Sequence, residues 1–517
     1  MTGILFQTRT AAPPRGRKDL SDMTSHTSRT LRPPLPQTDL IAGQWTTPTE
    51  RLNGTLDDPN TGTPRQHQSA TSAESVEQAI STAATLHHSQ RWALTPLDLR
   101  VRLLELVADG LAGMVEEIGY EDALSTGNPL TTTTRTASYL GPRVLSARDQ
   151  LALIGDQTAL SADGRDVRVL RRALGPAAVL APWNAPTFVA VAKVASALAA
   201  GCPVILKPSE WAPAGCQIVA EVIYDAVRQL GLPEAVFQLV HGGAAVGAQL
   251  AADARVRAIS FTGGTAAGRA VASAAAPHFT ALQLELGGHN PAVILPDADI
   301  GASAAAIAEG MTKLNGQWCE APGKVLVPAD VHDEFVDALL AQLGALRVGH
   351  CLDEGTDVGP LAYAAHRDRL NEQIHRLESL GGKALTNSVL PDLDGWFLAP
   401  TVVVGLSHEQ STHELFGPAV TVHPVSAIEE GLRAADGPET GLAGFVFGRD
   451  LSQALETAAR IPAGEIRVNG CKLADLADGS EQSFWNSAGI GGHGPTDMVR
   501  FFQGRRTVGV DDPTLPI

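Results

Sequence analysis

Cysteine is sparse in this chain, and long apolar runs are missing. Five cysteines are spread over 517 residues, and no two share a C-x-x-C spacing. This odd, scattered set predicts neither a disulfide framework nor a metal site, and it favours a reducing, cytoplasmic compartment. No apolar run reaches the roughly 18 residues of a membrane-spanning helix, and no secretory signal of the usual form is present.

Positive charge is also in short supply. With 39 Lys and Arg against 56 Asp and Glu, the formal net charge is −17, which argues against nucleic acid or an anionic membrane as a partner. The length, with 44% hydrophobic residues, indicates a globular protein of two or three domains. Residues 1–38 are basic and rich in Pro, Ser and Thr, which predicts a disordered tail. A transit peptide is the alternative, but the prolines would interrupt its helix.

Strands and helices alternate through the middle of the chain. Buried strands are predicted at 177–181, 203–207, 236–240 and 256–261, and helices at 187–200, 214–230, 244–252 and 266–275. Four such repeats predict an α/β fold with a parallel, doubly wound sheet covered by helices on both faces. Strands at 325–327, 401–404 and 419–422 predict a second α/β domain, and residues 167–172 alternate as a half-exposed hairpin strand does.

Polar residues follow three of the predicted strands. They are Trp183–Asn184, Lys207–Glu210 and Thr262–Thr265. Open parallel sheets bind ligands at the carboxyl ends of their strands. Gly263 and Gly264 precede a helix whose free N–H groups can face a pyrophosphate, and Lys207 with Glu210 can bind ribose hydroxyls. Without the G-x-G-x-x-G order each turn alone reads as structural, but the three together favour a dinucleotide site.

Cys319 and Glu285 are the candidate reactive pair. Cys319 lies among small and polar residues before an apolar run, and Glu285 is embedded in an apolar segment followed by two glycines. A thiol nucleophile needs a base or electrostatic help, and a thioester needs an activated water to be cleared. A lone cysteine is more often a buried core residue, and the acid could equally be a structural one.

Six motifs occur in order along the chain: Pro182–Pro186, Leu206–Glu210, Phe261–Thr265, Leu284–Gly288, Gly316–Cys319 and Glu414–Pro418. Together they resemble the motifs of the NAD(P)-dependent aldehyde dehydrogenase superfamily, and the resemblance spans residues 39–508. The resemblance implies an NAD-dependent oxidation of an aldehyde to a carboxylic acid through a cysteine thiohemiacetal and thioester. It makes Cys319 the nucleophile, Glu285 the general base for the hydrolytic water, and Asn184 with the Cys319 backbone N–H the oxyanion hole.

The same resemblance implies a cofactor site and a substrate tunnel. The expected cofactor residues are Trp183, Lys207, Glu210, Thr262, Gly263, Gly264, Glu414 and Phe416, and the expected tunnel residues are Ala185, Phe188, Trp318 and Glu320. Because Glu210 would repel a 2′-phosphate, NAD is expected over NADP. Glu320 could attract a cationic aldehyde, or it could be a solvated acid turned away from the tunnel.

The family fold implies a division of the chain and a small-molecule aldehyde as partner. Residues 39–150 with 172–286 would form the NAD-binding domain, 287–482 the catalytic domain, and 151–171 with 483–517 a small β oligomerisation element of a homodimer or homotetramer. A CoA-acylating or thioester-reducing relative, and a catalytically silent homologue, remain as alternatives. The departures from the family pattern are Gly264, His289, Glu320 and Trp485.

Overall fold

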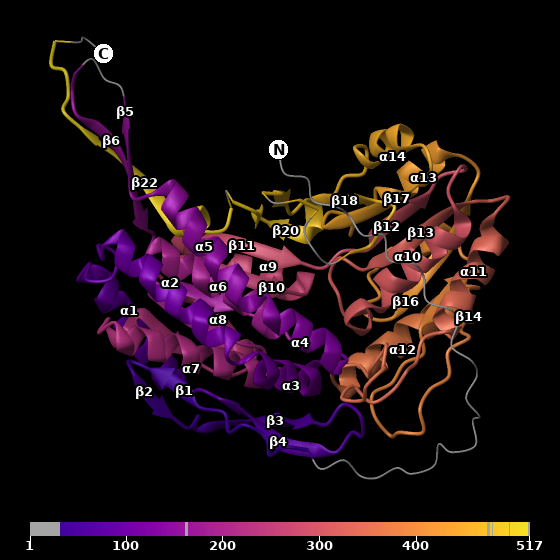
Figure 1. Cartoon of the computed structure of the whole chain (residues 1–517), viewed down its shortest axis with the longest axis horizontal. Helices are drawn as coiled ribbons and strands as arrows, with labels where there is room; N and C mark the ends of the chain where they lie inside the picture. Colours follow the sequence, from indigo (N-terminus) through magenta and orange to yellow (C-terminus); the bar gives the residue numbers. More distant parts are fainter. Residues whose placement is uncertain (1–30, 161–163, 473–475, 478, 496, 515–517) are drawn as a thin grey trace, which may run out of the picture. The chain divides into compact units, whose positions relative to one another are not determined.

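The computed structural model describes residues 31–160, 164–472, 476–477, 479–495 and 497–514 (Figure 1). Residues 36–517 form one compact unit. Most of the predicted tail, residues 1–30, lies outside the described residues, and its described part, 31–38, has neither helix nor strand. Within the described chain, no helix is both long enough and apolar enough to cross a membrane.

The first sheet has eight strands in the order β2-β1-β9-β8-β7-β10-β11-β20. The strands are β1 (Asp39–Ile41), β2 (Gln44–Thr46), β7 (Ala177–Leu180), β8 (Val204–Lys207), β9 (Phe237–Leu239), β10 (Ala258–Gly263), β11 (Ala281–Leu286) and β20 (Gly489–Ile490). Strands β9, β8, β7, β10 and β11 run parallel, and β1 and β20 pair antiparallel at their outer sides. The predicted doubly wound sheet is therefore confirmed.

Helices cover both faces of this sheet. They are α1 (Ala73–His88), α2 (Leu97–Ala112), α3 (Val115–Thr126), α4 (Leu130–Ser138), α5 (Leu140–Ile154), α6 (Pro186–Ala200), α7 (Ala214–Gln229), α8 (Ala244–Ala252) and α9 (Thr265–Ala275). One face packs against α1, α8 and α9, and the other against α6 and α7. Helix α6 begins with Pro186 in its first turn and ends at the left-handed Gly201, which fixes both of its ends.

The second sheet has seven strands in the order β14-β15-β16-β13-β12-β17-β18. They are β12 (Asn290–Ile294), β13 (Pro322–Pro328), β14 (Lys383–Leu385), β15 (Thr401–Val404), β16 (Ala419–Val425), β17 (Ala443–Phe447) and β18 (Glu465–Val468). Its helices are α10 (Ile300–Thr312), α11 (His332–Gly344), α12 (Ala364–Ser379), α13 (Ile428–Ala435) and α14 (Leu451–Ala458). One face buries α10 and α11, and the other buries α13 and α14. The predicted second α/β region is thus present.

Smaller sheets complete the 36–517 unit. Strand β6 (Val167–Ala173), predicted at 167–172, lies between β5 (Gln157–Leu160) and β22 (Gln503–Gly509), and Figure 1 shows this sheet extending away from α5. Two pairs were not expected from the sequence: β3 (Glu50–Asp57) with β4 (Pro64–Ala70), and β19 (Gln482–Ser483) with β21 (Gly492–His493). The division of the chain into functional domains stays a prediction.

Candidate active site

A cavity of 910 Å³ lies at the carboxyl ends of the strands of the first sheet and reaches residues of the second. Every residue that the sequence singled out for catalysis, cofactor or substrate contributes to its wall. This placement follows from the topology, because Asn184, Lys207 and Thr262 come at the ends of the adjacent parallel strands β7, β8 and β10. Within the described residues, no cluster of three or more His, Cys, Asp or Glu could hold a metal ion.

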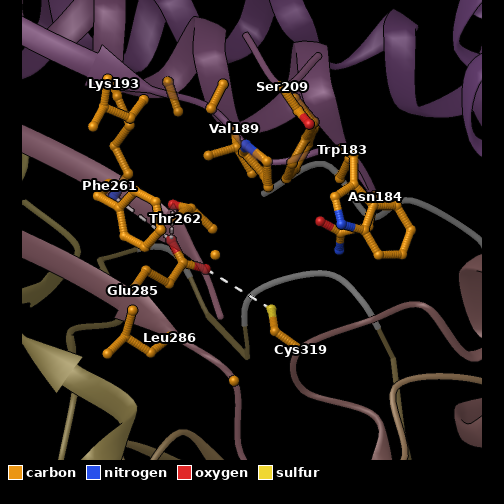
Figure 2. A pocket seen from close by; sticks show the side chains of 18 of the residues that line it. Trp183, Asn184, Val189, Lys193, Ser209, Phe261, Thr262, Glu285, Leu286 and Cys319 are labelled. Carbon is orange, nitrogen blue, oxygen red and sulfur yellow. Dashed lines mark hydrogen bonds and ion pairs between the residues drawn. The ribbon is translucent and has the colours of Figure 1, made fainter. Parts of the chain in front are cut away.

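The thiol of Cys319 faces the carboxylate of Glu285 across this cavity. The Cys319 Sγ lies 3.9 Å from Glu285 Oε1, and Figure 2 shows the two side chains pointing toward each other. Glu285 is on β11, so the sheet fixes its position, whereas Cys319 is on the loop between α10 and β13. Cys319 and Glu285 are thus brought within hydrogen-bonding distance of each other by the fold.

The second carboxylate oxygen of Glu285 is held by three other side chains. His493 Nε2 lies 2.9 Å from Oε2, the Thr262 hydroxyl donates to it at 3.3 Å, and Lys193 Nζ lies 3.9 Å away. Burial would raise the pKa of Glu285, but His493, Lys193 and Thr262 outweigh burial and hold the pKa below its ordinary value. The carboxylate is therefore ionised at neutral pH.

The carboxylate of Glu285 acts on the Cys319 thiol in the opposite direction. Burial raises the pKa of the Cys319 thiol well above its usual range, and the carboxyl groups of Glu285, Glu320 and Glu414 add to this rise. The resting sulfur is thus protonated. Its proton has one near acceptor, Glu285 Oε1, which makes deprotonation a directed transfer rather than loss to solvent.

The loop that carries Cys319 is held in an unusual backbone conformation. Leu314, Asn315 and Gly316 are consecutive residues with φ of 50°, 55° and 72°, in the left-handed region. At Gly316 a Cβ would lie 2.1 Å from the carbonyl carbon of Gly417, so only glycine fits there. Each non-glycine residue in this region costs about 1–2 kcal/mol, which the surrounding contacts must offset.

Two buried amide side chains hold this loop. The Asn315 side chain donates to the carbonyls of Gly127 and Pro360 and accepts from the Gly359 N–H. The Gln317 side chain donates to the Thr126 carbonyl and accepts from the Ala362 N–H at 2.9 Å each. Because both amides bind segments on either side of the loop, the position of the thiol is determined by the surrounding chain rather than by the loop itself.

Asn184 and Asn290 complete the surroundings of the thiol. The Asn184 side chain donates to the Gln317 carbonyl at 2.8 Å, and its second N–H remains for the cavity. Asn290, on β12, donates to the carbonyls of Cys319 and Ala321 at 2.8 and 2.9 Å. The sequence drew attention to Asn184, Cys319 and Glu285, and the structure brings them around one cavity (Figure 2).

The far part of the cavity has the shape and chemistry of a nucleotide cradle. Lys207 and Glu210 line it beside Gly243 and Gly247 at the start of α8. A Cβ at Gly243 would lie 3.3 Å from the Glu210 carboxylate, whereas a Cβ at Gly264 would meet nothing within 4 Å. The open side of Gly264 precedes α9, whose first N–H groups can receive a phosphate. These residues therefore fit a dinucleotide.

Another part of the cavity is lined by Glu414, Phe416 and Trp183. The rings of Trp183 and Phe416 meet edge-on with their centroids 5.5 Å apart, and Tyr363 and His366 pack against the same indole. The Glu414 carboxyl accepts from the Gly288 N–H at 3.3 Å. Burial raises the pKa of Glu414 to about 8 against the effect of that N–H, so the carboxyl carries a proton at neutral pH.

Known proteins match the chain over most of its length. A family model described as "Aldehyde dehydrogenase family" matches residues 45–508. The chain belongs to this family. Aldehyde dehydrogenases are oxidoreductases, so the predicted fold and enzyme class are both confirmed. A geranial dehydrogenase from Castellaniella defragrans is 31% identical over 445 residues, which cover 83% of this chain and 90% of that protein.

Solved structures of the aldehyde dehydrogenase family agree with the fold. A betaine aldehyde dehydrogenase mutant from Staphylococcus aureus, in complex with NAD⁺, superposes with a TM-score of 0.86 at 25% identity, covering 93% of this chain and 99% of that one. An aldehyde dehydrogenase mutant from Pseudomonas syringae, in complex with NAD⁺ and octanal, has a TM-score of 0.84 at 28% identity, covering 92% and 96%. These complexes support a nicotinamide cofactor for this dehydrogenase.

Glu320 lines the cavity of this aldehyde dehydrogenase, and two neighbouring side chains interact with its carboxyl group. Gln482 donates to one oxygen at 3.2 Å, and Arg467 lies 3.8 Å from the other while pairing with Glu465 at 2.8 Å. Burial raises the pKa of Glu320 to about 7, and Glu465 adds to this against the opposing Arg467. The reading of Glu320 as a solvated acid turned away from the tunnel does not fit this placement, because its side chain is 15% exposed and lines the cavity. The attraction of a cationic aldehyde stays a prediction.

Several site residues of this dehydrogenase escaped the sequence reasoning. They are Lys193, His493, Gln317, Asn290, Arg467 and Gln482. Lys193 sits in the small-residue helix α6, and its single charge in an otherwise apolar helix is a signal that could have marked it. His493 gave no such signal, because it reaches Glu285 only through the pairing of β20 with β11. His289, one of the departures, is buried against Ser411 and does not line the cavity.

Proposed function

We propose that this aldehyde dehydrogenase oxidises an aldehyde to its carboxylic acid through a covalent intermediate on Cys319, which Glu285 helps to hydrolyse. The observation that carries the proposal is the approach of Cys319 Sγ to Glu285 Oε1, 3.9 Å, inside a cavity that also contains a nucleotide cradle. Its test is a panel of aldehydes with NAD, followed by NADH absorbance and by identification of the acid. Absence of turnover with every aldehyde would favour a catalytically silent homologue.

In the first half of the reaction, Cys319 bonds to the aldehyde carbon. The thiol proton passes to Glu285 Oε1, its nearest acceptor, and the sulfur attacks the carbonyl to form a thiohemiacetal. The free N–H of Asn184 and the backbone N–H of Cys319 stabilise the oxygen as negative charge develops on it. The oxidised nicotinamide supplies the hydride acceptor, and the carbon left behind on the sulfur is a thioester.

In the second half, Glu285 first releases the thiol proton to solvent and then acts as general base on a water that attacks the thioester. Its ionised state suits this role, as does the placement of Oε1 toward the sulfur. A carboxylate at this position favours hydrolysis over transfer of the acyl group to coenzyme A. Adding free coenzyme A to the assay separates the two, because hydrolysis leaves no acyl-CoA.

Replacing Asn184 with alanine is expected to lower kcat about 10²–10³-fold, the usual cost of one oxyanion-hole donor. The aldehyde KM should change little, because the amide acts on charge that develops after binding. Steady-state kinetics measure both quantities. Because Asn184 also donates to the Gln317 carbonyl, a thermal melt must show that the loop is intact. A kcat within about twofold of the wild type would remove Asn184 from the oxyanion hole.

We infer NAD rather than NADP as the cofactor, because the Glu210 carboxylate faces the cradle beside Lys207. A 2′-phosphate there would meet a like charge. Replacing Glu210 with serine is expected to lower the preference for NAD over NADP, in kcat/KM, by about tenfold or more. Glu210→Asp retains the charge and serves as the matched control. An unchanged preference in Glu210→Ser would show that another residue selects the cofactor.

We also propose a homodimer or homotetramer in a reducing, cytoplasmic setting. All five cysteines are free thiols, and the strands β5 and β22 on either side of β6 present the apolar side chains of Leu160 and Val508 in exposed positions. Such a sheet suits pairing with another copy. Light scattering after gel filtration measures the assembly, and a monomer at micromolar concentration would contradict the proposal.

A further inference from the structure

The two carboxylate oxygens of Glu285 have different neighbours. Its Oε1 faces the sulfur of Cys319 at 3.9 Å, while its Oε2 lies 2.9 Å from His493 Nε2. His493 comes from the C-terminal part of the chain, which returns to the first sheet through β20 and then forms β21, the strand that carries His493. Among the described residues, the sulfur of Cys319 has its side-chain contact with Glu285 and not with His493, so the effect of His493 on the chemistry must pass through Glu285.

We infer that His493 is a positioning residue for the general base: its Nε2–H anchors Glu285 Oε2, so that Oε1 alone is presented to Cys319 and to the hydrolytic water. The inference rests on the proposed role of Glu285 in hydrolysing the thioester. It adds that a histidine from the C-terminal part of the chain determines which of the two Glu285 oxygens acts as the base.

The imidazole of His493 is held firmly enough to do this. Its backbone pairs with Gln482 between β21 and β19, and its ring meets Phe484 edge-on at 4.9 Å and 88°. Phe484 itself is buried against Leu442 and Ala488. The side chain of His493 is 34% exposed, and Glu285 only 9%. The ring thus has one packed face and one fixed hydrogen-bonding edge.

The charges around His493 determine which atom carries the proton. The groups that face it are Glu285 on β11, Lys193 on α6 and Arg143 on α5. Burial and the positive charge of Lys193 lower the pKa of His493, while Glu285 opposes this. An ionised carboxylate can only accept hydrogen bonds. Nε2 is therefore the protonated nitrogen, and a neutral imidazole is sufficient for the proposed role.

The supported step is the hydrolysis of the thioester. Water forms the new C–O bond to the acyl carbon and gives one proton to Glu285 Oε1. The C–S bond then breaks, the sulfur leaves with the electron pair, and the proton on Glu285 passes to it. The products are the carboxylic acid and the free thiol. Throughout, the His493 proton stays on Nε2, which keeps Oε2 from competing for the proton of the water.

Two variants of nearly equal size separate hydrogen bonding from packing. His493→Gln places an amide N–H at a similar reach, whereas His493→Leu keeps an apolar body without a donor. In His493→Leu the pKa of Glu285 should rise, because burial is no longer opposed by this donor. Since the protonated carboxyl cannot act as a base, the acidic limb of the kcat profile should move up by about one pH unit or more.

At neutral pH Glu285 stays ionised in the variant, so the loss of rate there reports positioning alone. Because Oε1 is no longer held toward the water, kcat of His493→Leu should fall about tenfold while the aldehyde KM stays within about twofold. Intact-protein mass spectrometry of the quenched enzyme should show a larger acylated fraction. His493→Gln should retain the wild-type limb and most of kcat. An unmoved limb in His493→Leu, or equal losses without a limb shift in both variants, would overturn the inference and leave only a packing role.

The proposed function is tested separately by Glu285→Gln in the same assay. If this variant turns over normally, the base has been misassigned and the proposed function fails. If Glu285→Gln stops hydrolysis while His493→Leu behaves as the wild type, only the inference about His493 fails. The amount of NADH released in the first turnover counts the folded active sites in each sample, so that a misfolded variant is recognised.

Discussion

Replacing Cys319 with alanine is expected to abolish aldehyde oxidation, lowering kcat by at least about 10⁴-fold. The sulfur forms the bond that holds the substrate through both halves of the reaction, and no second thiol lines the cavity within the described residues. The other four cysteines are buried in the cores. NADH production from an accepted aldehyde measures the loss, and cofactor binding by calorimetry shows that the cradle is intact.

The matched control for this variant is Cys471→Ala. Cys471 belongs to the core cluster around α10 and does not line the cavity, so its removal tests loss of a thiol without loss of the nucleophile. We expect it to retain wild-type turnover with some loss of stability. Substantial turnover in Cys319→Ala would show that the covalent route is wrong.

Replacing Glu285 with glutamine is expected to leave formation of the thioester intact and to slow its hydrolysis. The first turnover should release about one equivalent of NADH per active site, after which the steady-state rate should be about 10²–10⁴-fold slower than wild type. The amide cannot accept the water proton. Formation of the thioester should survive, because removal of the Glu285 charge lowers the pKa of the Cys319 thiol, so that solvent can take the proton that Glu285 accepts in the wild type.

Rapid mixing with stopped-flow absorbance resolves the two phases. A wild-type steady-state rate in Glu285→Gln would assign the base elsewhere. Loss of the initial burst together with the steady state would show instead that Glu285 is indispensable for attack by the thiol. The first result would contradict the proposed hydrolysis step. The second would contradict the expectation that the thioester still forms when Glu285 is replaced.

The first sheet and one side of the site were predictable from the sequence, because ligands bind at the carboxyl ends of parallel strands and each strand end can be recognised from nearby residues. Alternating buried strands and helices predicted a parallel sheet, so the polar residues directly after its strands had to lie at one edge, and the structure places β8, β7 and β10 side by side. Asn184, Lys207 and Thr262 are in this group. The place of Cys319 above that edge followed only from the family resemblance, since a loop between α10 and β13 carries no periodic signal.

The remaining site residues depend on contacts between distant segments. His493 reaches Glu285 because β20 adds to the edge of β11, and nothing in the residues near position 493 indicates that pairing. Glu320 looked like a free charge in the sequence, whereas Arg467 and Gln482 bind it in the folded chain. The strained backbone at Leu314 and Asn315 is likewise maintained by segments that the local sequence cannot name.

The most direct test of the account is to locate the acyl group itself. Glu285→Gln is mixed with an accepted aldehyde and NAD, quenched in acid, digested and mapped by mass spectrometry. We expect one acyl group, with the mass of the substrate aldehyde less one hydrogen in place of the thiol hydrogen, on the peptide that contains Cys319. An unmodified Cys319 peptide after a full equivalent of NADH has formed, or an acyl group on another residue, would contradict the account.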